Sequence, residues 1–177
     1  MKHRVIVFIL IVFYSYCGFS QQNTDSDIMT HVASIDQTID TYYDVLSEDK
    51  AVERNWKLFK FLFTKDAQLI PSTKNKDGVY VWRYMSPETY IKSSGLWMYE
   101  HGFIEKEINR KVEVFGPIAH VFSTYEAYHS KADTEPFMRG INSIQLLNDG
   151  ERWWIVNVYW TLETEHNRIP AEYLPKH

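Results

Sequence analysis

Two apolar segments on either side of a turn form the clearest pattern in the sequence. Residues 141–147 alternate imperfectly between apolar and polar, and residues 153–160 are almost all β-branched or aromatic. Between them, Asp149 and Gly150 tolerate the positive φ angles of a tight turn. The pattern predicts a long antiparallel hairpin. Its aromatic side chains fall on both faces, so we expect both faces to be covered.

Three helices are predicted in the first half of the chain. Apolar residues recur every three or four positions over residues 28–46, which predicts an amphipathic helix capped by Ser26 or Asp27. A second helix is expected from about residue 51 to residue 63. The third, over residues 86–99, opens with a serine cap followed by proline at the first helical position.

The remaining segments have the pattern of β-strands. Residues 67–70 form a short strand that Pro71 is expected to end, and residues 79–82 form a second, so the two predict a small hairpin at one edge. After residue 103 the apolar residues recur with period two, and a Phe-Gly-Pro turn leads to another long strand over residues 118–129. Helices followed by four long antiparallel strands predict an α+β fold, with the helices on one face of a strongly curved sheet.

The N-terminus has the pattern of a secretory signal peptide. A basic start precedes an apolar run, and small and polar residues follow, with cleavage expected after Ser20. The run is shorter than the roughly 20 apolar residues of a membrane anchor, and Tyr16 is a poor residue to precede a lipidated Cys17. We therefore predict a signal peptide over residues 1–20, a flexible lead-in over 21–27, and one exported domain, periplasmic or extracellular, over 28–177.

Charge and composition narrow the range of partners. The chain has 19 basic and 23 acidic residues, and loss of Lys2 and Arg4 with the signal peptide makes the balance more acidic. No basic stripe is available for a phosphate backbone, which argues against a nucleic-acid partner. No stable membrane insertion is expected after cleavage. Aromatic residues make up 16% of the chain, which favours a core or a cavity lined with rings.

The order of elements resembles the nuclear transport factor 2-like superfamily, particularly its exported bacterial members with a polyketide-cyclase-like domain. The resemblance is carried by the segments KVEVFGPIAHVFSTYEAY, RGINSIQLL and DGERWWIVNVYW, and by a proline-bearing tail, IPAEYLP. It implies a cone, in which a curved antiparallel sheet packs on three N-terminal helices around a pocket, a cystatin-like α+β roll. It also implies a homodimer formed through the outer face of the sheet. The superfamily includes ketosteroid isomerases, scytalone dehydratase and polyketide cyclases, and many members without activity.

The candidate catalytic residues are Glu126, His129 and Tyr125. Strand alternation places Glu126 on one face and Tyr125 with His129 on the other. A carboxylate that faces an apolar cavity has a raised pKa and can act as a general acid or base. The alternative interpretation is a surface glutamate paired with Arg139 or Arg110, with histidines that are exposed or bonded structurally.

Ketosteroid isomerase chemistry needs a carboxylate base and two donors to an oxyanion. Tyrosines are abundant, but we identify only Glu107, Glu113 and Glu126 as acids on the relevant strands, which leaves that activity in doubt. No metal-ligand spacing, glycine-rich phosphate loop or serine nucleophile motif is found, so no cofactor and no metal are expected.

Polar and aromatic groups in apolar segments are candidate ligand contacts, because buried polar groups need partners. The candidates are Tyr125, Asn142, Asn157, Tyr159, Trp97 and His101. Bonding within the sheet, or a place in the core, is the alternative for each of them. Three hypotheses follow: a domain that binds a small apolar or aromatic molecule in the cone, a cofactor-free isomerase, dehydratase or cyclase, and a protein-interaction module whose pocket is filled by its own side chains.

Overall fold

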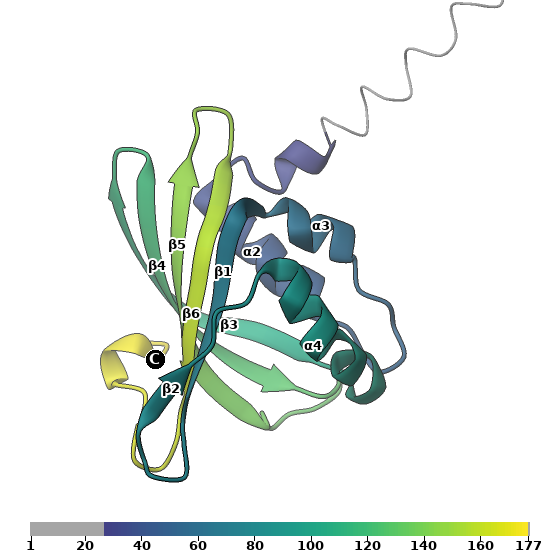
Figure 1. Ribbon diagram of the computed structural model, residues 1–177, viewed down its shortest axis with the longest axis vertical. Helices are drawn as coiled ribbons and strands as arrows, with labels where there is room; N and C mark the ends of the chain where they lie inside the picture. The colour runs from purple at the N-terminus through teal and green to yellow at the C-terminus, as the bar shows by residue number, and fades with distance from the viewer. Residues whose placement is uncertain (1–26, 177) are drawn as a thin grey trace, which may run out of the picture.

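A six-stranded curved sheet carries the α-helices α2, α3 and α4 on one face (Figure 1). The computed structural model describes residues 27–176, so the predicted signal peptide and nearly all of the lead-in lie outside the described residues. The strands follow the order β2-β1-β6-β5-β4-β3. Their bounds are Phe63–Lys74 (β1), Tyr80–Trp82 (β2), Ile104–Phe115 (β3), Ile118–Tyr128 (β4), Met138–Asn148 (β5) and Trp153–Leu162 (β6).

Three helices, α2 (Ile35–Leu46), α3 (Trp56–Phe61) and α4 (Pro87–His101), cover the face of the sheet that we call the inner face. A short 3-10 helix, η1 (Ala171–Tyr173), follows β6, and its last residue contacts the opposite, outer face. Strands β3 to β6 pair antiparallel in sequence order, and β1 pairs parallel with β6. The α+β class with a curved sheet and N-terminal helices is therefore confirmed.

The predicted hairpin of β5 and β6 is present, but its turn differs from the expected one. Asn148 pairs with Trp153, so four residues connect the strands. Gly150 has a φ of 102°, whereas Asp149 keeps a negative φ. The Asp149 carboxylate instead accepts hydrogen bonds from the amides of Glu151 and Arg152, each at 2.9 Å. Aspartate thus shapes the turn through its side chain, because that carboxylate mimics a backbone acceptor.

The helix predicted over residues 28–46 is divided in two. Residues 27–30 form one helical turn, and α2 begins only after Ser34, whose hydroxyl group accepts a hydrogen bond from the Gln37 amide at 3.1 Å. Between the two parts, the carbonyl of Val32 accepts a hydrogen bond from the Trp153 amide at 2.9 Å. This contact with β6 draws the chain out of the helical path, so Ser34 caps α2 in place of Ser26 or Asp27.

Replacing Ser34 by alanine is expected to lower the free energy of unfolding by about 1 kcal/mol, since the N-cap oxygen is lost. Urea denaturation of both proteins at one pH measures the difference. Ser130→Ala, in the loop after β4, is a suitable comparison because that hydroxyl group accepts only from the Ala132 amide outside any helix. Equal losses in both variants would contradict the capping role.

The second predicted helix and the first predicted strand also have different bounds. Helix α3 spans only residues 56–61, and Phe63 already pairs with Ile155 of β6. Strand β1 continues through Pro71, which was expected to end it. The Pro71 carbonyl faces the edge of the sheet, where it accepts a hydrogen bond from the Arg83 amide. The nitrogen of Pro71 faces the same side, and few hydrogen bonds form there, so the strand tolerates proline at this position. The predicted edge hairpin with β2 is present, and so is α4 with its Ser86 cap.

Aromatic rings fill much of the space between the helices and the inner face. Phe59 is fully buried, and its ring lies 4.9 Å from that of Phe63 and 5.8 Å from that of Tyr90. Tyr42 contacts Phe59 and Phe63, and Tyr90 meets Trp160 of β6 edge to face. These contacts hold three helices against the sheet and place tyrosine hydroxyl groups inside the fold.

Candidate functional site

A buried carboxyl group, that of Glu105, lies on the inner face near the start of β3. Glu105 pairs with Ala127 of β4 and is only 7% exposed. Its backbone is fixed to the end of α2, because the Ser47 hydroxyl group accepts from the Glu105 amide at 2.8 Å. Burial raises the pKa of Glu105 to about 7, and the hydrogen bond from Asn142 Nδ2, at 3.1 Å, opposes that shift only in part. The carboxyl group therefore changes its protonation state near neutral pH.

Four tyrosines surround this carboxyl group: Tyr42 and Tyr43 on α2, Tyr90 on α4, and Tyr125 on β4. Burial raises the pKa of each phenol, and the charge of Glu105 is the next cause in every case. The rings of Tyr42 and Tyr43 lie 5.4 Å apart, and Tyr125 pairs with Glu107, the next inner-face residue of β3 after Glu105, so these phenols lie on the same side of the sheet as the carboxyl group. All four are therefore neutral hydrogen-bond donors at physiological pH. We call Glu105, Asn142 and these four tyrosines the inner cluster.

The hydroxyl groups of the inner cluster differ in their bonding. Tyr43 Oη accepts from Asn142 Nδ2 at 3.1 Å and lies 2.6 Å from Ser123 Oγ. By contrast, the hydroxyl groups of Tyr42, Tyr90 and Tyr125 have no hydrogen-bond partner among residues 27–176. Within that range, Arg152 Nη1 is the one side-chain atom that is both fully enclosed and unpaired. The three hydroxyl groups are therefore not fully enclosed, and each can still form a hydrogen bond.

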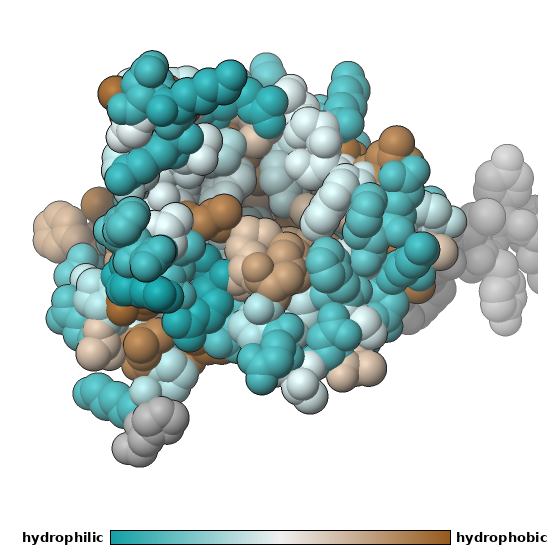
Figure 2. Space-filling view, turned by 90° about the horizontal axis from the view of Figure 1, so that it is seen from below, coloured by the Kyte–Doolittle hydropathy of each residue, from teal (hydrophilic) through white to brown (hydrophobic). Residues whose placement is uncertain are grey.

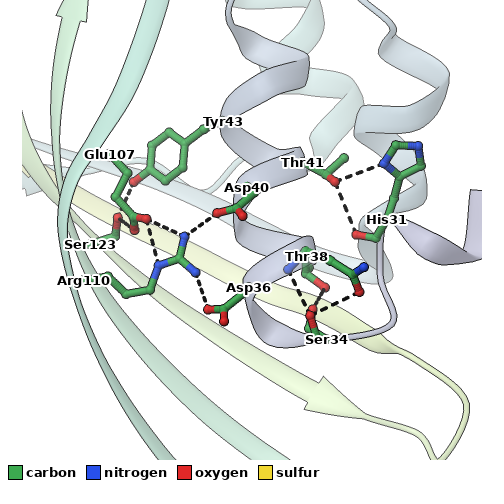
Figure 3. Close-up of polar contacts among 11 residues, drawn as sticks. His31, Ser34, Asp36, Thr38, Asp40, Thr41, Tyr43, Glu107, Arg110 and Ser123 are labelled. Carbon is green, nitrogen blue, oxygen red and sulfur yellow. Dashed lines mark hydrogen bonds and ion pairs between the residues drawn. The ribbon is translucent and has the colours of Figure 1, made fainter.

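A chain of polar contacts connects the inner cluster with the surface of α2 (Figure 3). Ser123, which contacts Tyr43, also donates a short hydrogen bond to Glu107. The other oxygen of Glu107 accepts from Arg110 Nε at 2.8 Å. Arg110 in turn pairs with Asp36 at 2.6 Å and with Asp40 at 2.7 Å, both on the exposed side of α2. This network fixes α2 on the sheet and so holds Tyr43 in place.

Five aromatic side chains gather where the end of α4 meets the starts of β3 and β5 and the end of β4. Trp97 stacks on His101 with ring centroids 5.0 Å apart, and His129 stacks on Phe137 at 4.1 Å. Trp97 and Phe137 each contact Phe103, and Trp97 also contacts His129. This end, which we call the lower end, lies toward the lower right of Figure 1, and the view from below shows hydrophobic side chains encircled by hydrophilic ones (Figure 2).

The structure divides the sequence-predicted residues between the two faces of the sheet. Tyr125 and Asn142 come together on the inner face as part of the inner cluster. Trp97, His101 and His129 meet in the aromatic group at the lower end. Asn157 and Tyr159 alternate with the inward-facing Val158 and belong to the outer face, where Tyr159 is 47% exposed.

Glu126 lies on the outer face as well. Its carboxylate accepts a hydrogen bond from the Tyr128 hydroxyl group at 2.7 Å and lies 3.7 Å from Arg139. This is the surface pairing considered as the alternative for Glu126. The carboxyl group beside tyrosines is that of Glu105, which the sequence analysis did not single out. Glu105 lies two residues before Glu107, on the same face of the strand. The alternation of side chains could therefore have identified Glu105 together with Glu107.

A mainly apolar cavity among the described side chains does not coincide with the inner cluster. It has a volume of about 320 Å³ and lies between the outer face of β4 to β6 and the C-terminal segment 163–173. Tyr159, Phe122, Ile169 and Tyr173 are among its lining residues. We place the candidate site on the inner face because a carboxyl group with a shifted pKa and unpaired hydroxyl groups converge there, which is typical of functional sites.

Residues 27–176 contain no group of three or more His, Cys, Asp or Glu side chains placed to hold a metal ion. No helix in the same part of the chain is long and apolar enough to cross a membrane.

Comparison with known proteins supports the fold. No family model matches the sequence, and no curated protein is significantly similar to it. A nuclear transport factor 2-like protein of unknown function from Pseudomonas putida is similar in structure, with a TM-score of 0.56, 10% identity, and coverage of 84% of this chain and 94% of that one. A protein of unknown function with a cystatin-like fold from Nostoc punctiforme gives a TM-score of 0.55, 10% identity, and coverage of 74% and 90%.

A third structure, a protein of unknown function from Mycobacterium tuberculosis, gives a TM-score of 0.55 and 13% identity, with coverage of 77% of this chain and 79% of that one. At these identities the likeness concerns the fold alone. The chain thus has a nuclear transport factor 2-like, cystatin-like fold, as the resemblance in sequence predicted.

Proposed function

We propose that the inner cluster binds a small, largely apolar molecule that presents one oxygen atom to Glu105 and the tyrosine hydroxyl groups. The observation that carries this proposal is the convergence of a buried carboxyl group, with a pKa raised to about 7, and three tyrosine hydroxyl groups that lack partners among residues 27–176. Unpaired polar groups inside an apolar site favour a ligand that supplies the missing hydrogen bonds.

The chemistry of the cluster defines the class of ligand. The phenols of Tyr42, Tyr90 and Tyr125 offer donors, so the ligand must offer an acceptor such as a hydroxyl or carbonyl oxygen. Glu105 donates when protonated and accepts when ionised, and its pKa of about 7 makes both forms available near neutral pH. The rings of Phe59, Phe63 and Trp160 nearby favour an aromatic or alicyclic body over a strongly polar one.

Binding is tested with 2-naphthol, an apolar ring system with a single hydroxyl group, by isothermal titration calorimetry. We expect Tyr125→Phe to weaken binding about fivefold, because one hydrogen bond to the ligand is lost. Tyr128→Phe is the matched control on the same strand, since that hydroxyl group bonds Glu126 on the outer face. Absence of 2-naphthol binding, or an equal effect of both substitutions, would refute the proposal.

A second candidate function is proton transfer without a cofactor at the same cluster. The observation that favours it is the pKa of Glu105, about 7, because a general base works best when its pKa is near the working pH. Ionised Glu105 would take a proton from a carbon next to a carbonyl group, and tyrosine hydroxyl groups would bind the oxygen on which negative charge develops. This hypothesis assigns to Glu105 the role that the sequence analysis considered for Glu126.

The two functions are separated by deuterium uptake at the α-carbon of 2-tetralone, followed by NMR in D2O. Proton transfer predicts uptake faster than in buffer with wild-type protein and loss of that excess in Glu105→Gln. Simple binding predicts no excess uptake, while the affinity for 2-naphthol remains.

Export and pairing of two chains stay part of the proposal. Export rests on the pattern of residues 1–20, which lie outside the described residues. For the pair, a partner on the outer face would also meet the C-terminal segment, because Tyr173 packs against Phe122 and its carbonyl accepts from Thr124 at 2.7 Å.

A further inference from the structure

The cavity on the outer face is separate from the inner cluster and has features of a binding site of its own. Its volume of about 320 Å³ is within the range of small-molecule pockets. Outward-facing residues of β4, β5 and β6, including Phe122, Ile141 and Tyr159, form its floor, and Ile169, Pro170 and Tyr173 form its other wall. Edge-to-face packing of Phe122 against Tyr173, at 4.9 Å, closes one end. The lining is mainly apolar.

A smaller cavity of about 150 Å³ extends the first one along the sheet. The two share Ser72, Thr161 and Leu162 in their linings. The smaller one reaches Lys74 and Tyr80, where the ammonium group of Lys74 lies 5.1 Å from the centre of the Tyr80 ring. We call these two adjoining spaces together the outer channel. It suits an extended apolar molecule better than a compact one.

The lining of the outer channel contains more basic than acidic side chains. The one carboxylate in its lining, Glu163, accepts a hydrogen bond from Arg139 Nε at 2.7 Å and one from the Ile169 amide, and Arg139 Nη2 forms an ion pair with it, also at 2.7 Å. Burial raises the pKa of Glu163, but these contacts outweigh that effect and keep the pKa below its usual value, so Glu163 is ionised and neutralised by Arg139. The two cations of the lining, Arg168 and Lys74, have no carboxylate within 4 Å among residues 27–176.

Two side chains that line the outer channel can donate further hydrogen bonds. Arg168 is exposed at the border of the larger cavity and has five N–H donors. The Tyr159 hydroxyl group has no partner within the described part of the chain. An acidic protein, with a net charge of −4, thus presents two cations without an ion-pair contact along an apolar channel, although the charge of Arg168 also helps to lower the pKa of Glu163. This combination complements an apolar chain that ends in a negative charge.

We infer that the outer channel binds an elongated apolar monocarboxylate, such as a medium-chain fatty acid, with its carboxylate on Arg168 and its apolar chain against Tyr159 and Phe122. The inference is independent of the proposed function, because it concerns the opposite face of the sheet and none of the residues of the inner cluster. Arg168 is preferred over Lys74 because it borders the larger part of the channel, about 320 Å³ against about 150 Å³.

The inference is tested with decanoate and decanol, measured by isothermal titration calorimetry at low ionic strength. Decanoate is expected to bind at least tenfold more tightly than decanol, and Arg168→Gln is expected to weaken decanoate about tenfold with little effect on decanol, since one charge-assisted contact is lost. Tyr159→Ser should weaken both ligands. Arg83→Gln is the matched control, because Arg83 lines neither cavity.

Three results would overturn the inference: an absence of decanoate binding, equal affinity for decanol and decanoate, or an equal effect of Arg83→Gln and Arg168→Gln. Loss of decanoate binding in Tyr125→Phe, with Arg168→Gln unaffected, would place the carboxylate in the inner cluster instead. Failure of 2-naphthol to bind would refute the proposed function and leave this inference standing.

Discussion

Replacing Glu105 by glutamine is expected to raise the free energy of unfolding at pH 8 by about 3 kcal/mol. Burial raises the pKa of this carboxyl group from 4.5 to about 7, so the folded protein holds the proton more tightly than the unfolded chain does. The contribution of Glu105 to stability therefore falls as the pH rises from about 4.5 to about 7, and stays constant above that. Glutamine keeps the acceptor for Asn142 and never ionises.

The measurement is a series of urea denaturation curves at pH values from 4 to 8 for both proteins, taking the difference in the free energy of unfolding at each pH. Subtraction removes the contributions of other groups that titrate in this range. Glu113→Gln, on the same strand but with a side chain that is 86% exposed, should change stability by less than about 0.5 kcal/mol at every pH. A difference for Glu105→Gln that does not vary with pH would contradict the shifted pKa.

Replacing Gly140 by alanine is expected to destabilise the fold by about 1 to 3 kcal/mol and to displace the hydroxyl group of Tyr125. A Cβ atom at residue 140 would lie 2.6 Å from the Thr161 carbonyl oxygen and 2.7 Å from Tyr125 Oη. Glycine at this position permits the tyrosine to lie directly across β5. Because the added methyl group would press directly on the phenol of the inner cluster, affinity for 2-naphthol should fall together with stability.

Stability is measured by urea denaturation, and affinity by calorimetry on the fraction that remains folded. Gln145→Ala, at an exposed position of the same strand, should change stability by less than about 0.5 kcal/mol and leave 2-naphthol binding intact. A Gly140→Ala protein as stable as wild type would show that the strand adjusts without cost. Unchanged binding despite lower stability would separate Tyr125 from the ligand site.

The fold could be predicted from the sequence where local patterns and turn residues agree. The β5 and β6 strands, the Ser86 cap and the proline at the start of α4 all follow from signals within a few residues. Predictions failed where a distant contact decided the outcome. The break before Ser34 depends on a hydrogen bond between Val32 and Trp153, which no local pattern records.

The candidate site could be predicted only in part. Alternation correctly placed Tyr125 on the face opposite Glu126, but the sequence does not state which face carries the helices. A register shift between Glu107 and Asn109 interrupts the strict alternation of β3. Arg110 therefore lies on the inner face, next to Ser123, although simple alternation would place it on the outer face. The importance of Glu105 depends on its burial beneath α2 and α4, which arises only in the assembled fold. The outer channel likewise depends on the path of the C-terminal segment, which has no periodic pattern.

The most direct test of the account is a crystal structure of the protein with 2-naphthol. We expect the ring system on the inner face, with its hydroxyl oxygen about 3 Å from the Glu105 carboxyl group or the Tyr125 hydroxyl group. Density for the probe only in the outer channel beside Tyr159, or no bound probe with the inner-face rings closed together, would contradict the assignment of function to the inner cluster.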